Sequence, residues 1–307
     1  MSRRRETRSL FLGALLCIVF APATQAEVQQ RCIPRPVTGG GIDATAHPPA
    51  VDRVTVASLN IAGQIRIADA LATWTRDRSV DILLLQEVGH ASSDGRTFMA
   101  ALSARLGGGF AYAPADLVEN GHTQGLAIVS RYPLRDIRVH RLDYFRLRFR
   151  SRCRIALAAT VETSVGPVRL VNVHLDTRIN SANRVAQLAP AVDALRVFDG
   201  PRIIGGDFNT MNIRWFRTMW PLPYLQRQSA AVRALLASAG FHTPFTGSPP
   251  TFRVLGLPLR LDWLYVTGLD ALEWGVDRVR FTDHRGVWVR VTPGEPRIPQ
   301  RRGPGRP

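Results

Sequence analysis

Short apolar runs of strand length recur along this chain, and most of them end in a polar group. The runs occupy residues 54–57, 80–85, 168–171, 202–204 and 257–261. Runs this short, dominated by Val, Ile and Leu, are typical of buried β-strands rather than of helices. The sequence therefore predicts a core built around β-sheet.

Apolar positions at helical spacing separate several of these runs. In residues 67–78, Ile67, Leu71 and Trp74 fall on one helical face, and residues 181–198 carry a similar stripe. Shorter helices are predicted at residues 95–106 and 229–239. Strands that alternate with helices in this way indicate an α/β domain.

Polar clusters stand at the ends of the predicted strands. Asn60 closes the first run and Asp262 follows the last. The other clusters are residues 86–87, 172–176, 205–210 and 282–286. Polar side chains on loops held by a rigid sheet are how many folds position their chemistry.

The clusters contain carboxylates, carboxamides and imidazoles. Oxygen ligands suit a hard divalent cation such as Mg2+, and the 7 histidines are too scattered for a zinc cage. Cleavage of a phosphodiester needs a cation on the nonbridging oxygens, a group that orients or deprotonates water, and a donor for the leaving oxygen. The clusters supply residue types for all three tasks.

The same residues resemble the endonuclease/exonuclease/phosphatase superfamily, from about Val54 to about Val291. Each motif alone is weak, but seven of them follow the order of the family. They are Ser58-Leu59-Asn60, Leu85-Gln86-Glu87, Gly125-Leu126-Ala127-Ile128-Val129-Ser130, Asn172-Val173-His174-Leu175, Gly206-Asp207-Phe208-Asn209, Leu261-Asp262-Trp263-Leu264-Tyr265 and Thr282-Asp283-His284. The resemblance implies an α/β fold, a four-layered α/β sandwich in which two packed, mostly antiparallel β-sheets are flanked by helices, over residues 51–292.

The resemblance also implies roles for individual residues. Mg2+, or Mn2+ in its place, would be held by Glu87 with Asn60 and Asp283. The residues implied in catalysis are Asp207 for the attacking water, Asn209 for the scissile phosphate, His284 with its partner Asp262 for the transition state, and His174 for the leaving group. The Asp262–His284 pairing also has a physical reason, because a carboxylate on one imidazole nitrogen fixes the tautomer and favours the cation.

Ordinary structural roles are open to each cluster taken singly. Residues 205–210 contain turn formers and make a plausible turn, residues 86–87 resemble a helix cap or a solvated loop, and His174 resembles a packed core histidine. Asp262 alone resembles a surface charge. The occurrence of all of them in family order favours the active site.

The ends of the chain differ from its body. Residues 1–26 read as a signal peptide, with arginines, an apolar stretch and small residues before Glu27, so an exported, periplasmic or extracellular protein is expected; an uncleaved anchor is the alternative. Residues 27–50 read as a Gly/Pro-rich linker, and residues 293–307 as a disordered basic tail. In an oxidising compartment Cys32 and Cys153 either form a disulfide or leave Cys153 as a buried thiol.

Positive charge dominates the chain. The formal net charge is +16, and all 40 basic residues are arginine. In residues 146–154 arginine alternates with other residues, which predicts a strand with an arginine face that includes Arg150 and Arg152. Such a face either binds phosphates or is a solvated surface in an arginine-rich protein.

Residues 215–225, next to the Asp207 loop, are rich in aromatics and include Trp215 and Trp220. Such a run is most simply a helix packed on the core, while stacking on nucleobases or insertion at a lipid interface are the functional alternatives. We expect a monomeric phosphodiesterase with a polyanionic partner, either nucleic acid, which is favoured, or an anionic membrane surface. A phospholipid phosphodiesterase of sphingomyelinase type and a catalytically inert binding protein are the alternatives.

Overall fold

Two β-sheets form the centre of the protein. The structure, a computed structural model, describes residues 37–40, 52–89, 95–117, 123–148, 151–254 and 256–294. The first sheet has the strand order β1 (Thr38–Gly40), β4 (Gly109–Leu117), β5 (Thr123–Ser130), β3 (Ile82–Val88), β2 (Val54–Asn60), β16 (Arg285–Pro293) and β15 (Leu269–Arg278). The second has the order β14 (Asp262–Thr267), β9 (Arg202–Asp207), β8 (Gly166–His174), β7 (Ile155–Thr163) and β6 (Leu134–Arg141).

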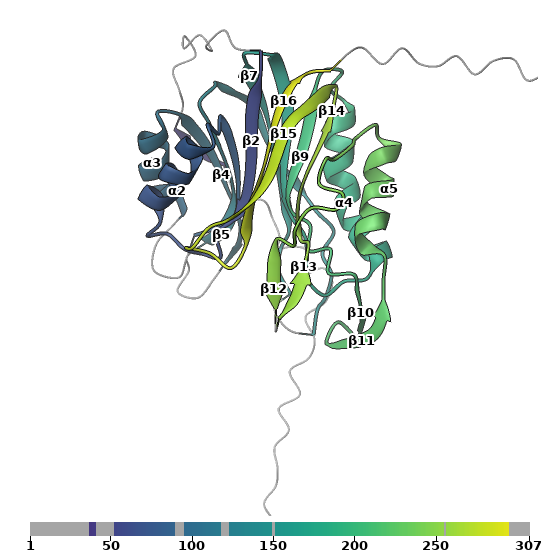
Figure 1. The fold of residues 1–307 in the computed structure, drawn as a ribbon. Coiled ribbons are helices and arrows are strands. Elements are labelled where there is room, and N and C mark those ends of the chain that lie inside the picture. The colour runs from purple at the N-terminus through teal and green to yellow at the C-terminus, as the bar shows by residue number, and fades with distance from the viewer. Residues whose placement is uncertain are drawn as a thin grey trace, which may run out of the picture.

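Helices cover the outer face of each sheet, which gives four layers (Figure 1). The helices are α2 (Ala68–Asp77), α3 (Gly95–Leu106), α4 (Ser181–Arg196) and α5 (Gln228–Ser238). β2 pairs with β3, and β8 with β9, in parallel, while the other described pairs are antiparallel. The predicted fold class, a four-layered sandwich with two mostly antiparallel sheets, is confirmed.

The alternation of side chains along β2 and β3 explains why both faces of the first sheet are buried. Val54 and Val56 face the second sheet, whereas Ala57 and Leu59 face α2 and α3. Neighbouring side chains of a strand point to opposite faces, so a strand buried on both sides reads as a continuous apolar run. The run at residues 80–85 in the sequence has this origin.

The four predicted helices are confirmed within one to two residues at each end. Leu71 is buried against the first sheet, and Leu188, Val192 and Leu195 are buried against the second. Among the described residues, no helix is long and apolar enough to cross a membrane.

The helix expected at residues 215–225 is wrong. This segment contains β10 (Ile213–Phe216) and β11 (Trp220–Leu225), which form an antiparallel hairpin. Pro221 and Pro223 lack the N–H group that an interior helical position donates, and proline is tolerated at strand edges. A second hairpin is formed by β12 (Phe252–Val254) and β13 (Leu257–Leu259).

The strand expected at residues 146–154 is also wrong. The described part of this segment is a loop between β6 and β7, and residues 149–150, with Arg150, lie outside the described residues. The Ser151 hydroxyl accepts a hydrogen bond from the Leu147 amide at 2.8 Å and donates to the Leu147 carbonyl at 3.0 Å. Such local hydrogen bonds pair the polar groups of the backbone without pairing to another strand. The segment is therefore not a strand, and its arginines do not share one strand face.

Two further expectations concern the N-terminal region. Thr38–Gly40, expected within the linker, form strand β1 on β4, where Gly39 and Gly40 allow the chain to approach Phe110 closely. Cys153 is disulfide-bonded, so the alternative of a free thiol is wrong. The other cysteines, Cys17 and Cys32, lie outside the described residues, as do the predicted signal peptide and residues 295–307.

Candidate active site

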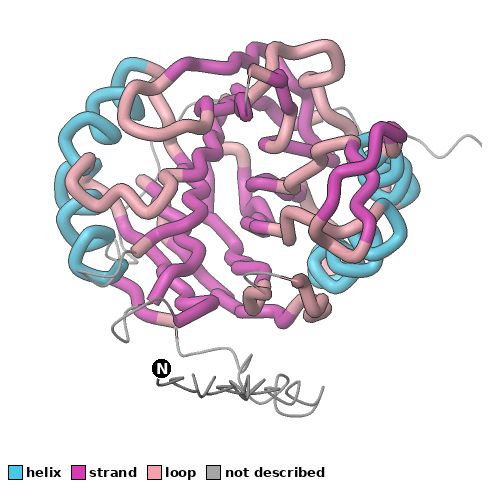
Figure 2. The backbone as a smooth tube through the Cα atoms, turned by 90° about the horizontal axis from the view of Figure 1, so that it is seen from below, coloured by secondary structure: helices cyan, strands magenta, loops and turns pink. Residues whose placement is uncertain are grey.

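The polar clusters meet at one edge of the two sheets, the edge that faces the viewer in Figure 2. Asn60, His174 and Asp207 are the last residues of β2, β8 and β9. Asp262, expected after a strand, is instead the first residue of β14. Because β14 runs antiparallel to β9, its first residue stands opposite Asp207, the last of β9.

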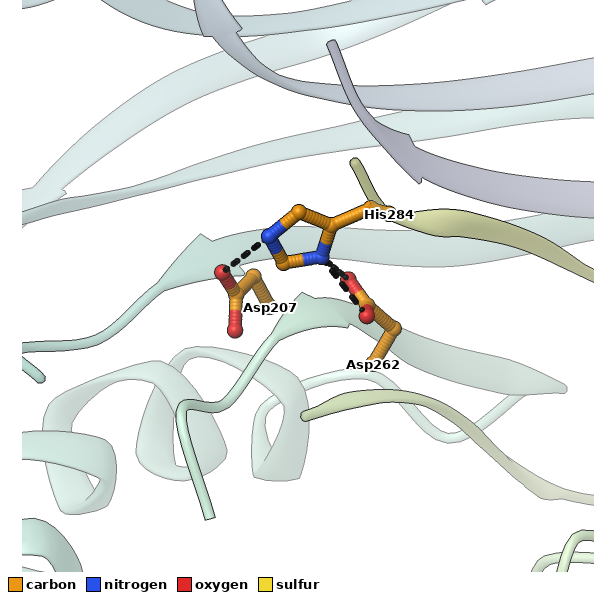
Figure 3. A group of neighbouring side chains, drawn as sticks. All are labelled: Asp207, Asp262 and His284. Atoms are coloured by element: carbon orange, nitrogen blue, oxygen red, sulfur yellow. Dashed lines mark hydrogen bonds and ion pairs between the residues drawn. The ribbon is translucent and has the colours of Figure 1, made fainter. Parts of the chain in front are cut away.

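His284 and Asp262 form a buried pair (Figure 3). His284 Nδ1 lies 2.9 Å and 3.2 Å from the two carboxylate oxygens of Asp262. Burial alone would lower the pKa of His284, but the charge and hydrogen bond of Asp262, together with Asp207 and Asp283, outweigh it and raise the pKa to about 10. His284 is therefore an imidazolium at neutral pH, with Nε2 turned toward Asp207 at 3.9 Å.

Asp207 is the central carboxylate of the cluster. Its Oδ2 lies 3.5 Å from His174 Nε2 and accepts a hydrogen bond from the Asn60 amide at 3.1 Å. Burial and the charge of Asp262 raise its pKa, although His284, the Asn209 amide and Asn60 act in the opposite direction, and the result is about 6. A carboxylate of this kind accepts a proton near neutral pH more readily than an exposed aspartate.

His174 differs from His284 in charge. Burial, with the nearby charges of Arg154 and His284, holds the pKa of His174 well below its usual value. At neutral pH the site thus contains one neutral and one cationic imidazole, both near Asp207 Oδ2. Titratable groups whose environments separate their pKa values are a common mark of an acid–base site.

Glu87 lies on a distortion of β3. The register of β3 against β5 shifts between Leu85 and Val88, and Glu87 has a φ of 54°. A bulge of this kind redirects a side chain, and a positive φ is costly for a residue other than glycine. The Glu87 carboxylate accepts hydrogen bonds from Asn60 and from Gln124, each at 3.2 Å.

The Asp207 loop is held by close backbone packing. Gly206 has a φ of 140°, and a Cβ there would lie 1.9 Å from the Val173 carbonyl oxygen. Asn209 has a φ of 50°, its backbone amide donates to Asp207 at 2.9 Å, and its side-chain amide donates to the Leu175 carbonyl at 2.9 Å. Gly206 and Asn209 therefore have backbone roles, besides any part that the Asn209 side chain takes in the chemistry.

Arg184 is a residue that sequence reasoning missed. It is fully buried on α4, and it donates to the carbonyls of Asp176 and Phe208, both at 2.7 Å. Burial lowers its pKa to about 9. Arg184 joins the loops that carry His174 and Asp207, and only its place on an otherwise apolar stripe in the sequence hints at this.

Gln124 and Thr251 were missed as well. Gln124 links Glu87 to Arg152, whose guanidinium donates to the Gln124 side-chain oxygen at 2.7 Å. The Thr251 hydroxyl accepts from the amides of Leu261 and Asp262 at 2.9 Å and 3.1 Å. Gln124 stands directly before the motif at residues 125–130, which was a usable signal, whereas nothing in the sequence marks Thr251.

Similarity to known proteins agrees with this geometry. The sequence profile described as the Endonuclease/Exonuclease/phosphatase family matches residues 57–287. The chain belongs to this family. Among curated proteins, no sequence matches significantly.

Solved structures share the family fold with this chain at low sequence identity. A family protein from Beutenbergia cavernae aligns with a TM-score of 0.62 and 20% identity, over 80% of this chain and 72% of that one. The human nocturnin catalytic domain, with a bound sulfate anion, aligns at 0.59 and 20%, over 81% and 100%. Humanized D. rerio TDP2 aligns at 0.55 and 17%, over 79% and 100%.

The family is metal-dependent in general, and the donors at this edge fit a hard cation. Asn60 and Glu87, two of the three expected ligands, are in contact, and the Thr282 hydroxyl lies 2.9 Å from the Asn60 carbonyl and 3.4 Å from Asp283, the third. Asp207, Asp262 and His284 also offer ligand atoms within 4.8 Å of one another. Because Asp262 already bonds His284 Nδ1, the carboxylate oxygens of Glu87 are more available to a cation than those of Asp262.

The residues expected to bind substrate are only partly brought together. Arg152 and Trp215 line a cavity of about 550 Å³ that also contacts Glu87 and His174. Trp220 lies on β11 and is 60% exposed. Arg150 lies outside the described residues.

Proposed function

We propose that the protein is a Mg2+-dependent phosphodiesterase, with Mn2+ as a substitute, and that nucleic acid is its substrate. The observation that carries the proposal is the arrangement around Asp207, in which one oxygen of a buried carboxylate lies near both a neutral and a cationic histidine. A tetrahedral anion bound to the related nocturnin domain agrees with a phosphate substrate.

Each side chain has a task that follows from its protonation state. Asp207, with a pKa of about 6, accepts the proton of the attacking water. The His284 imidazolium, oriented by Asp262, donates from Nε2 to the charge that develops on the phosphoryl oxygens. His174 contacts the phosphate and assists the leaving oxygen.

Glu87 and Asn60, with Asp283, would hold the cation, which supplies charge neutralisation at the nonbridging oxygens. The Gln124 hydrogen bond to Glu87 fixes the orientation of that carboxylate. Arg152, on the other side of Gln124, adds positive charge where the substrate would enter.

The arginine-rich composition supports nucleic acid as the substrate, since a polyanion is attracted by counterion release. A phospholipid is the second candidate, and it is supported by apolar side chains at the tips of the two hairpins. Phe216, Trp220, Val254 and Leu257 are exposed there. Residues 1–26 support export, and we propose that the protein acts outside the cytoplasm as a monomer.

The test is hydrolysis by the purified protein of plasmid DNA, RNA and sphingomyelin vesicles in parallel, with Mg2+ or with EDTA. Asp207→Asn is the control, because it keeps the shape of the side chain and removes the base. Cation-dependent cutting of nucleic acid that Asp207→Asn abolishes is the expected result. Release of a phosphorylated headgroup alone would assign the phospholipid, and lack of turnover on all three would favour a binding protein on this fold.

A further inference from the structure

A second cavity, of about 750 Å³, adjoins the catalytic cluster at His284. Its walls come from β12, from the end of β15 and from the segment that leads into β16. Four arginines line it, namely Arg253, Arg278, Arg280 and Arg285. A volume of this size is within the range of about 300–1,000 Å³ that small-ligand sites occupy.

The positive charge of this cavity is not neutralised by the protein. Asp283 is the one acidic residue on its wall, and no ion pair joins the four guanidinium groups to an acid among the described residues. Arg278 and Arg285 are direct partners across the antiparallel ladder of β15 and β16. Like charges at directly opposite positions destabilise a sheet, so this pair of arginines lowers the stability of the fold. A bound anion would remove that repulsion, which suggests a role in ligand binding.

The wall of the cavity is attached to the catalytic imidazole. The ring of Phe252 on β12 packs on His284 with centroids 4.7 Å apart. The Arg285 backbone amide donates to the Thr251 carbonyl at 2.8 Å. A group bound among the arginines would therefore lie at a fixed place relative to the reacting centre.

The catalytic cluster thus adjoins two basic cavities. One is lined by His284 with the four arginines, and the other by His174 with Arg152, Arg154 and Arg178. Asp207 Oδ2 lies near both imidazoles, at 3.9 Å from His284 Nε2 and 3.5 Å from His174 Nε2.

We propose that the arginine cavity beside His284 is a subsite for the phosphate that neighbours the scissile one, so that the enzyme cuts within a nucleic-acid strand. The inference rests on the proposed function and specifies its substrate. Guanidinium groups bind phosphate oxygens through two parallel charge-assisted hydrogen bonds. A strand that carries its scissile phosphate at Asp207 presents further phosphates next to it, and the arginine cavity adjoins the cluster at His284.

A phospholipid matches this arrangement less well. A lipid with one phosphate would place that phosphate at the catalytic cluster and leave four guanidinium groups without an anion. Among the residues that line the cavity, the apolar side chains are Phe252 and Val279, beside four arginines. An acyl chain bound there would therefore lie against guanidinium groups and displace their water, which is unfavourable.

The test compares Arg278→Gln and Arg280→Gln with Arg196→Gln in the full protein. Arg196 ends α4, is exposed and pairs with Asp193 on its own helix, so its substitution removes the same charge away from the cavity. Binding of a short single-stranded DNA is measured by fluorescence anisotropy in EDTA over a range of salt concentrations. We expect about 10-fold weaker binding for each cavity variant, and a salt slope lower by about 1, with no comparable change for Arg196→Gln.

A second readout uses turnover with Mg2+ or Mn2+. Bis(4-nitrophenyl) phosphate has a single phosphate, so the cavity variants should hydrolyse it as the wild type does. The same DNA with one neutral methylphosphonate next to the cleaved linkage should be cut about 10-fold more slowly by the wild type, and not further slowed in Arg278→Gln. Thermal unfolding checks folding, and relief of the Arg278–Arg285 repulsion should leave Arg278→Gln at least as stable as the wild type.

Several results would overturn the subsite. One is that the cavity variants bind DNA with the same affinity and salt slope as Arg196→Gln. Another is that they lose as much activity on the single-phosphate diester as on DNA. A third is that the wild type cuts the DNA with the neutral linkage as fast as unmodified DNA. Preferred binding to sphingomyelin vesicles, unaffected by the variants, would overturn it in favour of lipid. Failure of the wild type on the single-phosphate diester would instead count against the proposed function, and the binding measurement would still decide the subsite.

Discussion

The protonation state of His284 depends on one neighbour, Asp262. The carboxylate is fully buried, and the Nδ1 hydrogen bond of His284 is the interaction that compensates its burial. A buried charge without a partner is strongly destabilising, so the pair contributes to folding besides its proposed role in catalysis. This double role makes the pair accessible to stability measurements in the absence of metal and substrate.

The contribution of His284 to stability should disappear at high pH. Its folded-state pKa of about 10 lies above the unfolded value, so the folded state holds the proton more tightly. The stabilisation is fully present below the unfolded pKa of 6.5 and is lost as the pH rises through about 10. In EDTA, the excess in unfolding free energy of the wild type over His284→Gln, measured by urea denaturation, should shrink steadily across that window. An excess that grows with pH would contradict the assignment of the charged imidazole.

The left-handed backbone conformation of Glu87 predicts that a glycine variant at this position is more stable than an alanine variant. Glu87→Ala and Glu87→Gly both remove the carboxylate and should both abolish metal-dependent turnover. At a φ of 54° glycine is relaxed and alanine is strained by about 1–2 kcal/mol, which exceeds the unfolded-state entropy that glycine adds, about 0.5–1 kcal/mol. Glu87→Gly should thus unfold at a higher urea concentration than Glu87→Ala, and the reverse order would show that the bulge is not strained.

At the scale of elements, the hairpin of β12 and β13 supports the catalytic pair from a distance in sequence. Thr251 precedes β12, and its hydroxyl serves the amides of Leu261 and Asp262 where β14 begins. Arg285, next to His284, is tied to the same threonine through its backbone. The hairpin therefore determines where Asp262 and His284 meet.

Two replacements of Thr251 should distinguish the effect of its hydroxyl group from the effect of its side-chain volume. Thr251→Val keeps the volume but leaves two buried amides without an acceptor, which costs about 1–3 kcal/mol. The unfolding free energy should fall by that amount and kcat should fall with it, because Asp262 is no longer held. Thr251→Ser retains the acceptor and should stay close to the wild type in both; similar losses in the two variants would assign the role of Thr251 to its methyl group instead.

The sequence predicted the elements whose signal is local. Apolar runs gave the strands around Asn60, Glu87, His174 and Asp207, and helical stripes gave the four helices. The hairpin at residues 213–225 was not predicted, because the helix prediction gave more weight to its aromatic residues than to Pro221 and Pro223, which disfavour a helix. Arg152 was predicted as a substrate residue on a strand, whereas Ser151 turns the segment into a loop and Arg152 reaches Gln124 from there.

The parts of the site that escaped prediction depend on contacts between distant segments. Arg184 bonds carbonyls of two loops, and the arginine cavity is lined by two segments, residues 251–253 with Arg253 and residues 278–285 with the other three arginines. No spacing along the chain brings Arg184 to its two carbonyls or Arg253 to the other arginines, since only the packing of distant segments does so. Motif order could predict the candidate catalytic residues because each of them stands at, or within two residues of, one end of a strand.

At the scale of the whole molecule, the two sheets are joined by a polar bridge through the apolar layer between them. Gln86 on β3 donates to the side-chain oxygen of Asn172 on β8 at 2.8 Å. The Asn172 amide donates in turn to the carbonyls of Leu85 and Ala127, at 2.8 Å and 2.9 Å, beside the bulge of β3. Both side chains are fully buried, so the bridge fixes the relative position of the edges that carry Glu87 and His174.

Loss of this bridge should both lower the free energy of unfolding and misalign the site. Asn172→Leu removes the buried hydrogen bonds of Asn172 to Gln86 and to the Leu85 and Ala127 carbonyls, and should lower the unfolding free energy by about 2–4 kcal/mol. In a double-mutant cycle with Gln86→Leu, the loss should fall short of the sum of the single losses by about 1 kcal/mol, whereas Asn172→Leu combined with the remote Arg196→Gln should be additive within about 0.5 kcal/mol. Because the two halves of the cluster stand on different sheets, kcat should decrease in Asn172→Leu even at temperatures where the protein remains folded. Full activity in a folded Asn172→Leu protein would mean that the apolar contacts alone align the sheets.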